Sequence, residues 1–258
     1  MKKSFLGVVA VLTVLIVVAV IGAGIFLDSI AKNSLETFGT KITQVSIKVD
    51  AVNLSLLNGA ARVKGIVVGN PEGYKTPQAI SIGSADVGVN PLSFFSDKIV
   101  VRSVLIETAD VTFEGGLGGN NLSKIMDNVN AIAKNGGPVS TDTTVKAANA
   151  PGRRFEVDDL LIIGAMVHVS LTGTGGKETT LPLPDIHLTN LGKNGAGITV
   201  TDLTRRVLGA ITTGAIKAVA NATTDIGKSA GNLGKDAGKA VGQGVNKITK
   251  GIGGLFQK

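Results

Sequence analysis

Few residues in this sequence can act as bases or as nitrogen ligands near neutral pH. There are two histidines, His168 and His187, and no cysteine. Each histidine occupies a polar position in an alternating pattern, and His168 stands between Val167 and Val169. That setting favours an ordinary exposed strand residue over a catalytic base or a metal ligand.

The sequence around these side chains carries little that supports chemistry. The acidic pair Asp158–Asp159 precedes His168, but no His-Glu-x-x-His zinc motif or Asp-rich calcium loop occurs. The run Gly115–Gly119 lacks the Gly-Lys-Ser/Thr of a phosphate-binding loop, so we interpret it as a turn. The sequence does not exclude a pair of carboxylates for glycoside hydrolysis, because two such residues come together only in the folded structure. We expect a protein that is not an enzyme, with no catalytic residue, no metal and no cofactor.

The first element along the chain is an apolar run from Phe5 to Leu27. As a helix, its 23 residues would span about 35 Å, enough to cross a hydrocarbon core of about 30 Å. A cleaved signal peptide is the alternative, but its apolar region is shorter, and only Gly22–Gly24 offers small residues for cleavage. The residues expected to anchor the chain in the bilayer include Phe5, Leu12, Leu15, Ile16, Ile21, Phe26 and Leu27.

The charges around this run predict its orientation. Lys2 and Lys3 precede it, whereas Asp28, Lys32 and Glu36 follow it with nearly balanced charge. The positive-inside rule then leaves residues 1–4 as a cytoplasmic tip before the anchor at 5–27. Because no second run of this length follows, we expect a single-pass inner-membrane protein with the bulk of its chain in the periplasm.

The amino-acid composition limits which classes of molecule the protein is expected to bind. The formal net charge is +7, but the chain has no Trp and one Tyr, so the stacking platforms of nucleic-acid-binding proteins are missing. We expect no nucleic-acid partner, and we assign the basic excess to anionic lipid headgroups or to solvation. Without cysteine, the exported part depends on burial and backbone pairing for its stability.

Beyond the anchor, the pattern changes from helical to strand-like. Residues 28–40 predict a helical extension that Gly39 ends. Val45, Ile47 and Val49 then alternate with polar residues, and a slip near Ala51 predicts a bulge that bends a sheet. The remaining segments are a first β-rich half with a short helix (41–133), a linker (134–153), a second β half (154–192) and a C-terminal amphipathic helix or helices (200–258).

Turn, cap and edge residues locate several boundaries. Asn58–Gly59 predicts a hairpin turn. Asn120 or Asn121 is expected to cap the short helix of the first half. Pro182 and Pro184 predict that the final extended stretch lies at an edge of the sheet.

One segment of the first β-rich half repeats in the second. A shift of 56 positions without a gap places similar apolar residues over one another. The aligned pairs are Val101 and Val157, Val104 and Leu160, Leu105 and Leu161, Ile106 and Ile162, Ala109 and Ala165, Val111 and Val167, and Phe113 and Val169. We interpret this as two similar strand pairs with a shared bend, added to one extended sheet, although chance similarity between β-rich segments is the alternative.

The last part of the chain predicts an amphipathic helix. Its apolar residues recur three or four positions apart, and they include Ile226, Leu233, Val241, Val245, Ile248, Ile252 and Leu255. Many glycines interrupt it, and each costs about 1 kcal/mol relative to Ala in a helix. Such a helix needs a surface, which is the apolar face of the sheet, a bilayer interface or a partner helix.

Several motifs together resemble the AsmA-like superfamily of envelope proteins. They are Val-Ser-Ile-Lys-Val at 45–49, Gly-Ile-Val-Val-Gly-Asn-Pro-Glu-Gly-Tyr at 65–74, Pro-Leu-Ser-Phe-Phe at 91–95, Asn-Leu at 121–122 and Leu-Pro-Leu-Pro-Asp-Ile-His-Leu-Thr-Asn-Leu-Gly at 181–192. The resemblance implies an inner-membrane anchor, a curved antiparallel sheet with an apolar concave face, and a role in outer-membrane biogenesis or phospholipid movement. It implies no catalytic residues.

We therefore expect a mainly β (α+β) fold: an N-terminal transmembrane helix, a curved antiparallel sheet built from repeated strand pairs, and an amphipathic C-terminal helix. The first functional hypothesis is a sheet groove that shields lipid or an apolar partner segment. Its candidate lining residues are Val45, Ile47, Val49, Val101, Val111, Phe113, Val157, Val167 and Val169. The second is a structural scaffold that binds envelope proteins without lipid cargo. The sequence leaves the lipid, the partner protein and the oligomeric state undefined.

Overall fold

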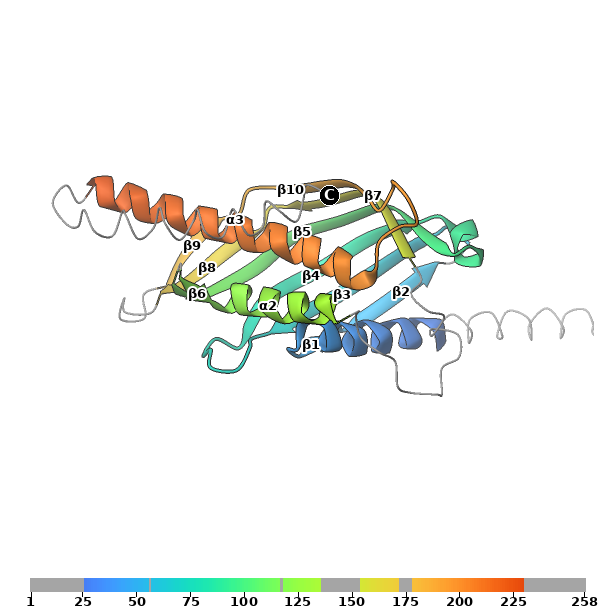
Figure 1. Cartoon of the computed structure of the whole chain (residues 1–258), viewed down its shortest axis with the longest axis horizontal. Coiled ribbons are helices and arrows are strands. Elements are labelled where there is room, and N and C mark those ends of the chain that lie inside the picture. Colours follow the sequence, from blue (N-terminus) through green and yellow to red (C-terminus); the bar gives the residue numbers. More distant parts are fainter. Residues whose placement is uncertain (1–25, 56, 117, 136–153, 172–177, 230–258) are drawn as a thin grey trace, which may run out of the picture.

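The computed structural model describes residues 26–55, 57–116, 118–135, 154–171 and 178–229. They form an α+β fold in which three helices lie over one face of an open ten-stranded mixed sheet (Figure 1). The helices are residues 26–43, α2 (Asn121–Lys134) and α3 (Val200–Ser229), and a 3-10 helix η1 (Pro91–Phe95) joins β4 to β5. The strands are β1 (Ile47–Lys48), β2 (Ala51–Ser55), β3 (Ala60–Gly69), β4 (Gln78–Val89), β5 (Lys98–Gly116), β6 (Gly119–Asn120), β7 (Arg154–Ile163), β8 (Met166–Leu171), β9 (Glu178–Pro182) and β10 (Ile186–Leu191).

The long strand β5 joins the two halves of the sheet. On one side, β4, β3 and then β1 and β2 follow in antiparallel pairs. On the other side, β7 and β8 pair with β5 in parallel, and β10 and β9 add antiparallel edges to them. The prediction of a wholly antiparallel sheet is therefore wrong at β5. A long connection that includes α2 separates β5 from β7, and such a connection lets the chain return in the same direction.

The two copies of the internal repeat pair with each other in this parallel part of the sheet, and the paired residues are 56 positions apart. Val101 pairs with Val157, and Ile106 pairs with Ile162, at the same offset that aligns the two segments in the sequence. Phe113 continues that offset by pairing with Val169 of β8. The repeated units are thus neighbours in the sheet. The first is the single strand β5, and the second is divided into β7 and β8.

A crease crosses the sheet, and we define it by Gly65, Gly83, Thr108 and Gly164. On both sides of it, residues that face the helices lie three positions apart rather than two, as in Ile106–Ala109 and Ile162–Ala165. Gly65, Thr108 and Gly164 have left-handed φ angles of 61°, 54° and 62°. One residue in this conformation reverses the alternation of the strand, so apolar residues before and after it face the same helices. The crease falls at the same position in both repeated units, but the sheet as a whole is open and not curled, so the prediction of a curved sheet is not confirmed.

The helical extension ends at residue 43, so the predicted end at Gly39 is wrong. Gln44 ends the helix in the left-handed conformation with φ 56°, and its N–H donates to the carbonyl of Thr40 over 2.8 Å. Gly39 lies inside the helix for a different reason. A Cβ there would come within 2.8 Å of Cδ1 of Ile47, so the glycine permits close packing on β1.

The same helix closes the outer edge of β1 and β2, whose backbone N–H groups have no neighbouring strand on that side. Side chains of the helix accept hydrogen bonds from these N–H groups: Asp28 from Leu54 over 2.8 Å, Glu36 from Val49 over 2.9 Å, and Thr40 from Ile47 over 3.1 Å. The helix therefore substitutes for a further strand, and it fixes the start of the described chain firmly to the sheet.

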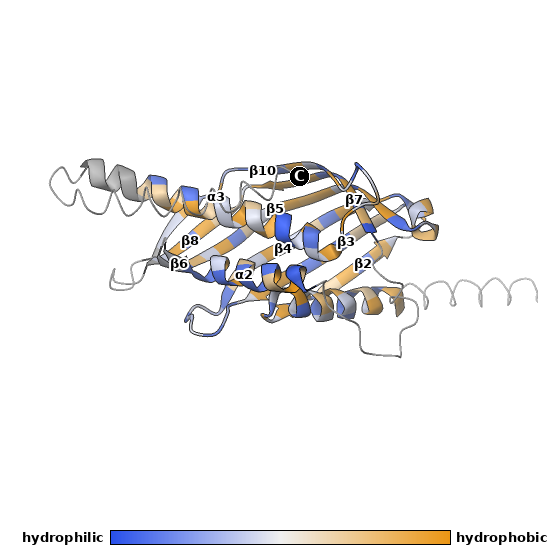
Figure 2. Ribbon diagram, in the orientation of Figure 1, coloured by the Kyte–Doolittle hydropathy of each residue, from blue (hydrophilic) through white to orange (hydrophobic). Residues whose placement is uncertain are grey.

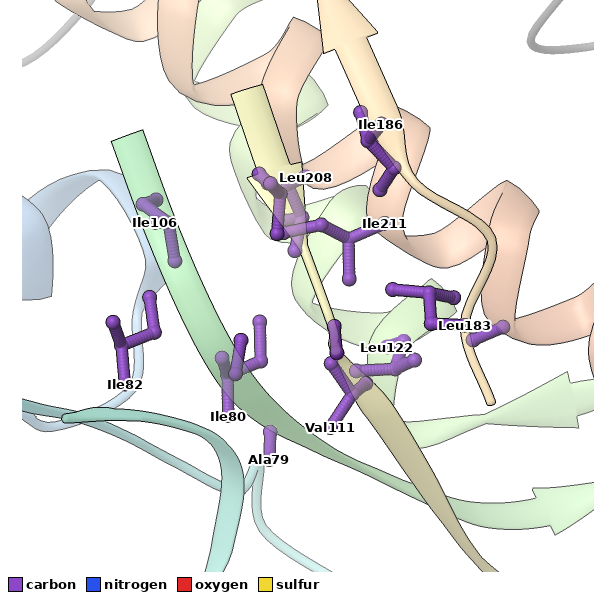
Figure 3. Packing of buried hydrophobic residues seen from close by; sticks show 14 of the residues in the cluster. Ala79, Ile80, Ile82, Ile106, Val111, Leu122, Leu183, Ile186, Leu208 and Ile211 are labelled. Atoms are coloured by element: carbon purple, nitrogen blue, oxygen red, sulfur yellow. The ribbon is translucent and has the colours of Figure 1, made fainter. Parts of the chain in front are cut away.

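The main hydrophobic core lies between the sheet and the helices, and Figure 2 shows apolar residues along β5, β7 and β10. From α2 it contains Leu122 and Ile125, both 0% exposed, and from α3 it contains Leu208 and Ile211. Figure 3 shows Leu208, Ile211 and Leu122 directed toward the strands. A smaller cluster of Val49, Val52 and Val63 lies under the first helix. One continuous apolar face of the sheet is thus covered by helices from three parts of the chain.

Several sequence predictions are confirmed. The hairpin turn at Asn58–Gly59 joins β2 to β3, and Asn120 is the cap of α2, with its side chain accepting from the N–H of Ser123 over 2.9 Å. Gly115 and Gly116 end β5 and pair with Asn120 and Gly119 of β6, so the chain reverses direction between these strands as predicted. Strands β9 and β10 each have a single neighbour, as Pro182 and Pro184 indicated.

Other predictions lie outside the described residues. They include the linker from residue 136 onward, the anchor up to residue 25, and the tail residues from Leu233 to Leu255. Phe26 and Leu27 belong to the first helix. Within the described part of the chain, none of the helices combines the length and apolar character that crossing a membrane requires.

Candidate functional site

The two histidines lie on the face of the sheet that points away from the helices. Nε2 of His168 is 2.9 Å from Oδ1 of Asp110, and Nδ1 is 3.1 Å from Oγ1 of Thr180. These three residues come from β8, β5 and β9, so they form a hydrogen-bonded row across adjacent strands. The His168 side chain is 41% exposed and that of Asp110 is 56% exposed. The row is a carboxylate, imidazole and hydroxyl arrangement in contact with solvent.

Similar pairs stabilise the rest of this outer face. Nε2 of His187 is 2.5 Å from Oδ1 of Asp159, and Nε of Arg62 is 2.5 Å from Oδ1 of Asp86. The hydrogen bond and the charge of Asp86 raise the pKa of the Arg62 guanidinium. Cross-strand pairs of polar side chains such as these contribute modestly to sheet stability. Both histidines therefore lie where the sequence predicted them, at polar positions of strands, on the outer face of the sheet.

Two further patterns bear on catalysis and metal binding. Among the residues that the structure describes, no group of three or more His, Cys, Asp or Glu side chains gathers in a way that could hold a metal ion. The pentapeptide at 227–231, Gly-Lys-Ser-Ala-Gly, matches the spacing of a serine nucleophile motif. Ser229, however, is the last residue of α3, whereas that motif requires a turn from a strand into a helix.

The predicted groove residues face the helices, but most of them are fully covered. Phe113 and Val167 are 0% exposed, and Val111 and Val157 are 1% exposed. The others, Val45, Val49, Val101 and Val169, are also buried, and Ile47 is partly buried. Alternation along the strands identified the correct face. The helices that cover it make this part of the face a packed core.

The cover is incomplete at one end of the sheet. Val87, Val89, Ile99 and Val104 belong to β4 and β5 next to η1, and they pack against the core while staying partly exposed. We call these four residues the half-covered strip. In Figure 1, η1 and the strand ends beside it extend past α2 and past the first turns of α3. The apolar face is therefore accessible at this end. Alternation in the sequence does not distinguish these four residues from the buried ones, because their exposure depends on where the helices lie.

The inner face of α3 contains polar atoms without partners. The hydroxyl of Thr212 is buried, as are the Nε atoms of Arg205 and Arg206, and none of the three has a hydrogen-bond partner in the structure. A buried polar group without a partner costs about 1–3 kcal/mol. These atoms reduce the net stabilisation of α3 on the sheet.

A polar network occupies the opposite end of the strands. Oε1 of Glu114 accepts the N–H of Lys75, and Oε2 accepts the N–H and the hydroxyl of Thr76, over 2.6–2.8 Å. Partial burial raises the pKa of Glu114, but the Thr76 side chain, these backbone N–H groups and the charge of Lys75 outweigh it, so the pKa lies below its usual value. Asn121, which is 0% exposed, links the same network to α2. The network joins the loop after β3, the end of β5 and the start of α2 by hydrogen bonds.

The fold and site together define an α+β protein with an open mixed sheet, a helix-covered apolar face and one partly open end. Comparison with protein-family models, with curated proteins and with solved structures finds no match for this chain.

Proposed function

We propose that this chain is a membrane-anchored, non-enzymatic protein of the cell envelope whose apolar sheet face receives lipid acyl chains or apolar segments. The proposal places the residues before the first helix in the inner membrane and the described domain in the periplasm. It extends the resemblance to the AsmA-like superfamily, and it assigns the protein to outer-membrane biogenesis or lipid handling. The observation that carries it is the half-covered strip, an apolar surface continuous with the core.

The strip is of a suitable size for part of an acyl chain. Complete burial of a Val or Ile side chain contributes about 1.5–3 kcal/mol, and the four strip side chains are each at most about one third exposed, so covering them contributes at most about 2–4 kcal/mol. At about 0.8 kcal/mol per buried methylene, this equals the transfer of about two to five methylene groups. An acyl chain that contacts only the strip is therefore held weakly and exchanges readily.

Withdrawal of α3 would make room for a whole acyl chain. Its buried apolar side chains include Leu208, Ile211, Ile216 and Val219, which together contribute about 6–12 kcal/mol. An acyl chain of about sixteen carbons contributes about 12 kcal/mol by the same rule. Leu203 and Val207 add to the contribution of α3, so the acyl chain offsets most of the cost of withdrawing it, and the unpaired polar atoms on α3 reduce the remaining difference.

A photo-crosslinking experiment on the full chain in its own membrane tests this function. A benzoylphenylalanine at Val104 lies on the strip, and one at Glu107 lies on the same strand but is exposed on the outer face. The two positions lie three residues apart on β5, about 10 Å, so proximity to the membrane alone would label both. We expect phospholipid adducts, identified by mass spectrometry, at Val104 and not at Glu107. Adducts at neither position, or equally at both, would contradict the proposal.

The second candidate function is a structural scaffold without lipid cargo. The observation that favours it is the complete burial of most predicted groove residues beneath α2 and α3. A disulfide between Leu183→Cys and Gly214→Cys distinguishes the two functions, because a Cβ at Gly214 would lie 3.7 Å from Cγ of Leu183 and the chain has no other cysteine. If α3 must withdraw, bound phospholipid decreases in the oxidised protein and recovers on reduction. A scaffold shows no phospholipid in either state.

A further inference from the structure

The largest exposed apolar side chains of the domain include four that lie at one end. Leu57 is 96% exposed, Phe95 is 91%, Leu92 is 77% and Phe26 is 67%. Leu57 is in the turn between β2 and β3, Leu92 and Phe95 are in η1, and Phe26 is the first described residue of the first helix. We call these four residues the apolar tip.

Hydrogen bonds bring these three segments together. The N–H of Val89, just before η1, donates to the carbonyl of Gly59 in the β2–β3 turn over 2.6 Å. The N–H of Leu54, just before the same turn, donates to Asp28 of the first helix over 2.8 Å. The turn thus lies between η1 and the start of the helix. In Figure 1, η1 and the start of the helix lie at the same end of the molecule.

The exposure of Leu92 and Phe95 is built into a well-defined element. The Asn90 side chain caps η1 by accepting the N–H of Leu92 over 3.2 Å. Ser93 is only 5% exposed, and its hydroxyl donates to the carbonyl of Asn90 over 2.6 Å and accepts the N–H of Val100 over 3.0 Å. Ser93 points inward as the fixed side of η1, so Leu92 and Phe95 are directed outward. Figure 2 shows apolar residues in this element.

We propose that the apolar tip inserts into the interfacial layer of the membrane from which the chain emerges. The inference rests on the proposed anchor, because the apolar run at 5–27 joins the described domain at Phe26, within the tip itself. A bilayer is therefore the apolar phase nearest to these side chains. Large apolar side chains presented together on a fixed element are typical of contact with the boundary between headgroups and acyl chains.

This placement has a consequence for the proposed function. Val89 and Ile99 of the half-covered strip are the residues that flank η1 on β4 and β5. With the tip in the interface, the open end of the apolar face lies against the bilayer. Acyl chains then reach the strip without crossing water.

Tryptophan fluorescence tests the insertion, because the natural chain has no Trp. Phe95→Trp places the probe on the tip. Tyr74→Trp is the matched control, because Tyr74 lies in the loop after β3, at the opposite end of a strand of about 30 Å. Each full-length variant is reconstituted into phosphatidylcholine and phosphatidylglycerol vesicles that contain phosphatidylcholine brominated on its acyl chains, where bromine quenches tryptophan on contact. Flotation of the vesicles after an alkaline wash measures anchoring separately.

We expect the fluorescence of Phe95→Trp to fall strongly with brominated lipid while that of Tyr74→Trp stays unchanged. If the protein floats with the vesicles but Phe95→Trp is not quenched, the tip does not touch lipid and the inference is wrong while the anchor stands. Equal quenching of both variants means that the domain lies flat on the membrane, which also overturns the inference. If the protein does not float, the anchor fails and the inference fails with it.

Discussion

Replacing Asn121 with Ala should destabilise the domain strongly. Asn121 is fully buried, and its Nδ2 donates to the carbonyl of Thr112 and to Oδ1 of Asn70, each over 2.8 Å. Its Oδ1 accepts the N–H of Glu114 over 2.9 Å. In the alanine variant, the carbonyl of Thr112, Oδ1 of Asn70 and the N–H of Glu114 each lose their hydrogen bond to residue 121. At about 1–3 kcal/mol for each group, reduced by some access of water at this end, we expect a loss of about 3–5 kcal/mol.

The assay is thermal unfolding of the full chain in a mild detergent, followed by circular dichroism. For a domain of this length, a loss of about 4 kcal/mol lowers the melting temperature by about 8–16 °C. Asn128→Ala is the matched control on the same helix, because Asn128 is half-buried and makes one hydrogen bond, from Nδ2 to the carbonyl of Thr43 over 3.0 Å. We expect about 1 kcal/mol there. Equal melting temperatures for the two variants would refute the reasoning about buried hydrogen bonds.

Two further predictions concern acid stability and the crease. Because the folded pKa of Glu114 is lowered, its stabilising contribution is present above the unfolded value of about 4.3 and is lost as the pH falls through the folded pKa. Urea midpoints at neutral and acidic pH should therefore differ more in the natural protein than in Glu114→Gln, and an equal difference would contradict this. Thr108→Gly should stabilise the protein by about 0.5–1 kcal/mol, because left-handed strain of about 1–2 kcal/mol is relieved and the entropy of glycine offsets part of it. Gly164→Thr should destabilise it by about 1–2 kcal/mol in the same urea titration although the nearest atom is 4.0 Å away, and a change of the same sign in both variants would contradict the account of the crease.

Local sequence signals predicted local structure well. Asn58–Gly59 identified a hairpin because few residues adopt its backbone conformation, and the side chain of Asn120 fits the cap of α2. The repeat carried the position of the crease, since the apolar spacing on each side of Thr108 and Gly164 is the same in both units. Gly39 was misinterpreted because a glycine that ends a helix and one that permits close packing look alike in a sequence.

Contacts between distant segments were beyond these signals. The repeat carried the register of β5 with its partner strands but not their parallel direction, which depends on the path of the intervening chain. The carboxylates of Asp28 and Glu36 bond to strand edges that no local pattern relates to them. Alternation placed Val111 and Phe113 on the apolar face, whereas their burial depends on helices from elsewhere in the chain. The predicted groove residues therefore lie on the apolar face, and helices cover most of them.

Native mass spectrometry of the full chain, released from phospholipid vesicles in a mild detergent, tests the central claim most directly. The natural protein and Ser103→Asp, whose change is exposed on the strand beside the strip, should each retain phospholipid. Val104→Asp places a charge within the strip and should lose it while keeping its circular dichroism spectrum. A natural protein without phospholipid, or a folded Val104→Asp variant that retains as much as Ser103→Asp, would contradict the account.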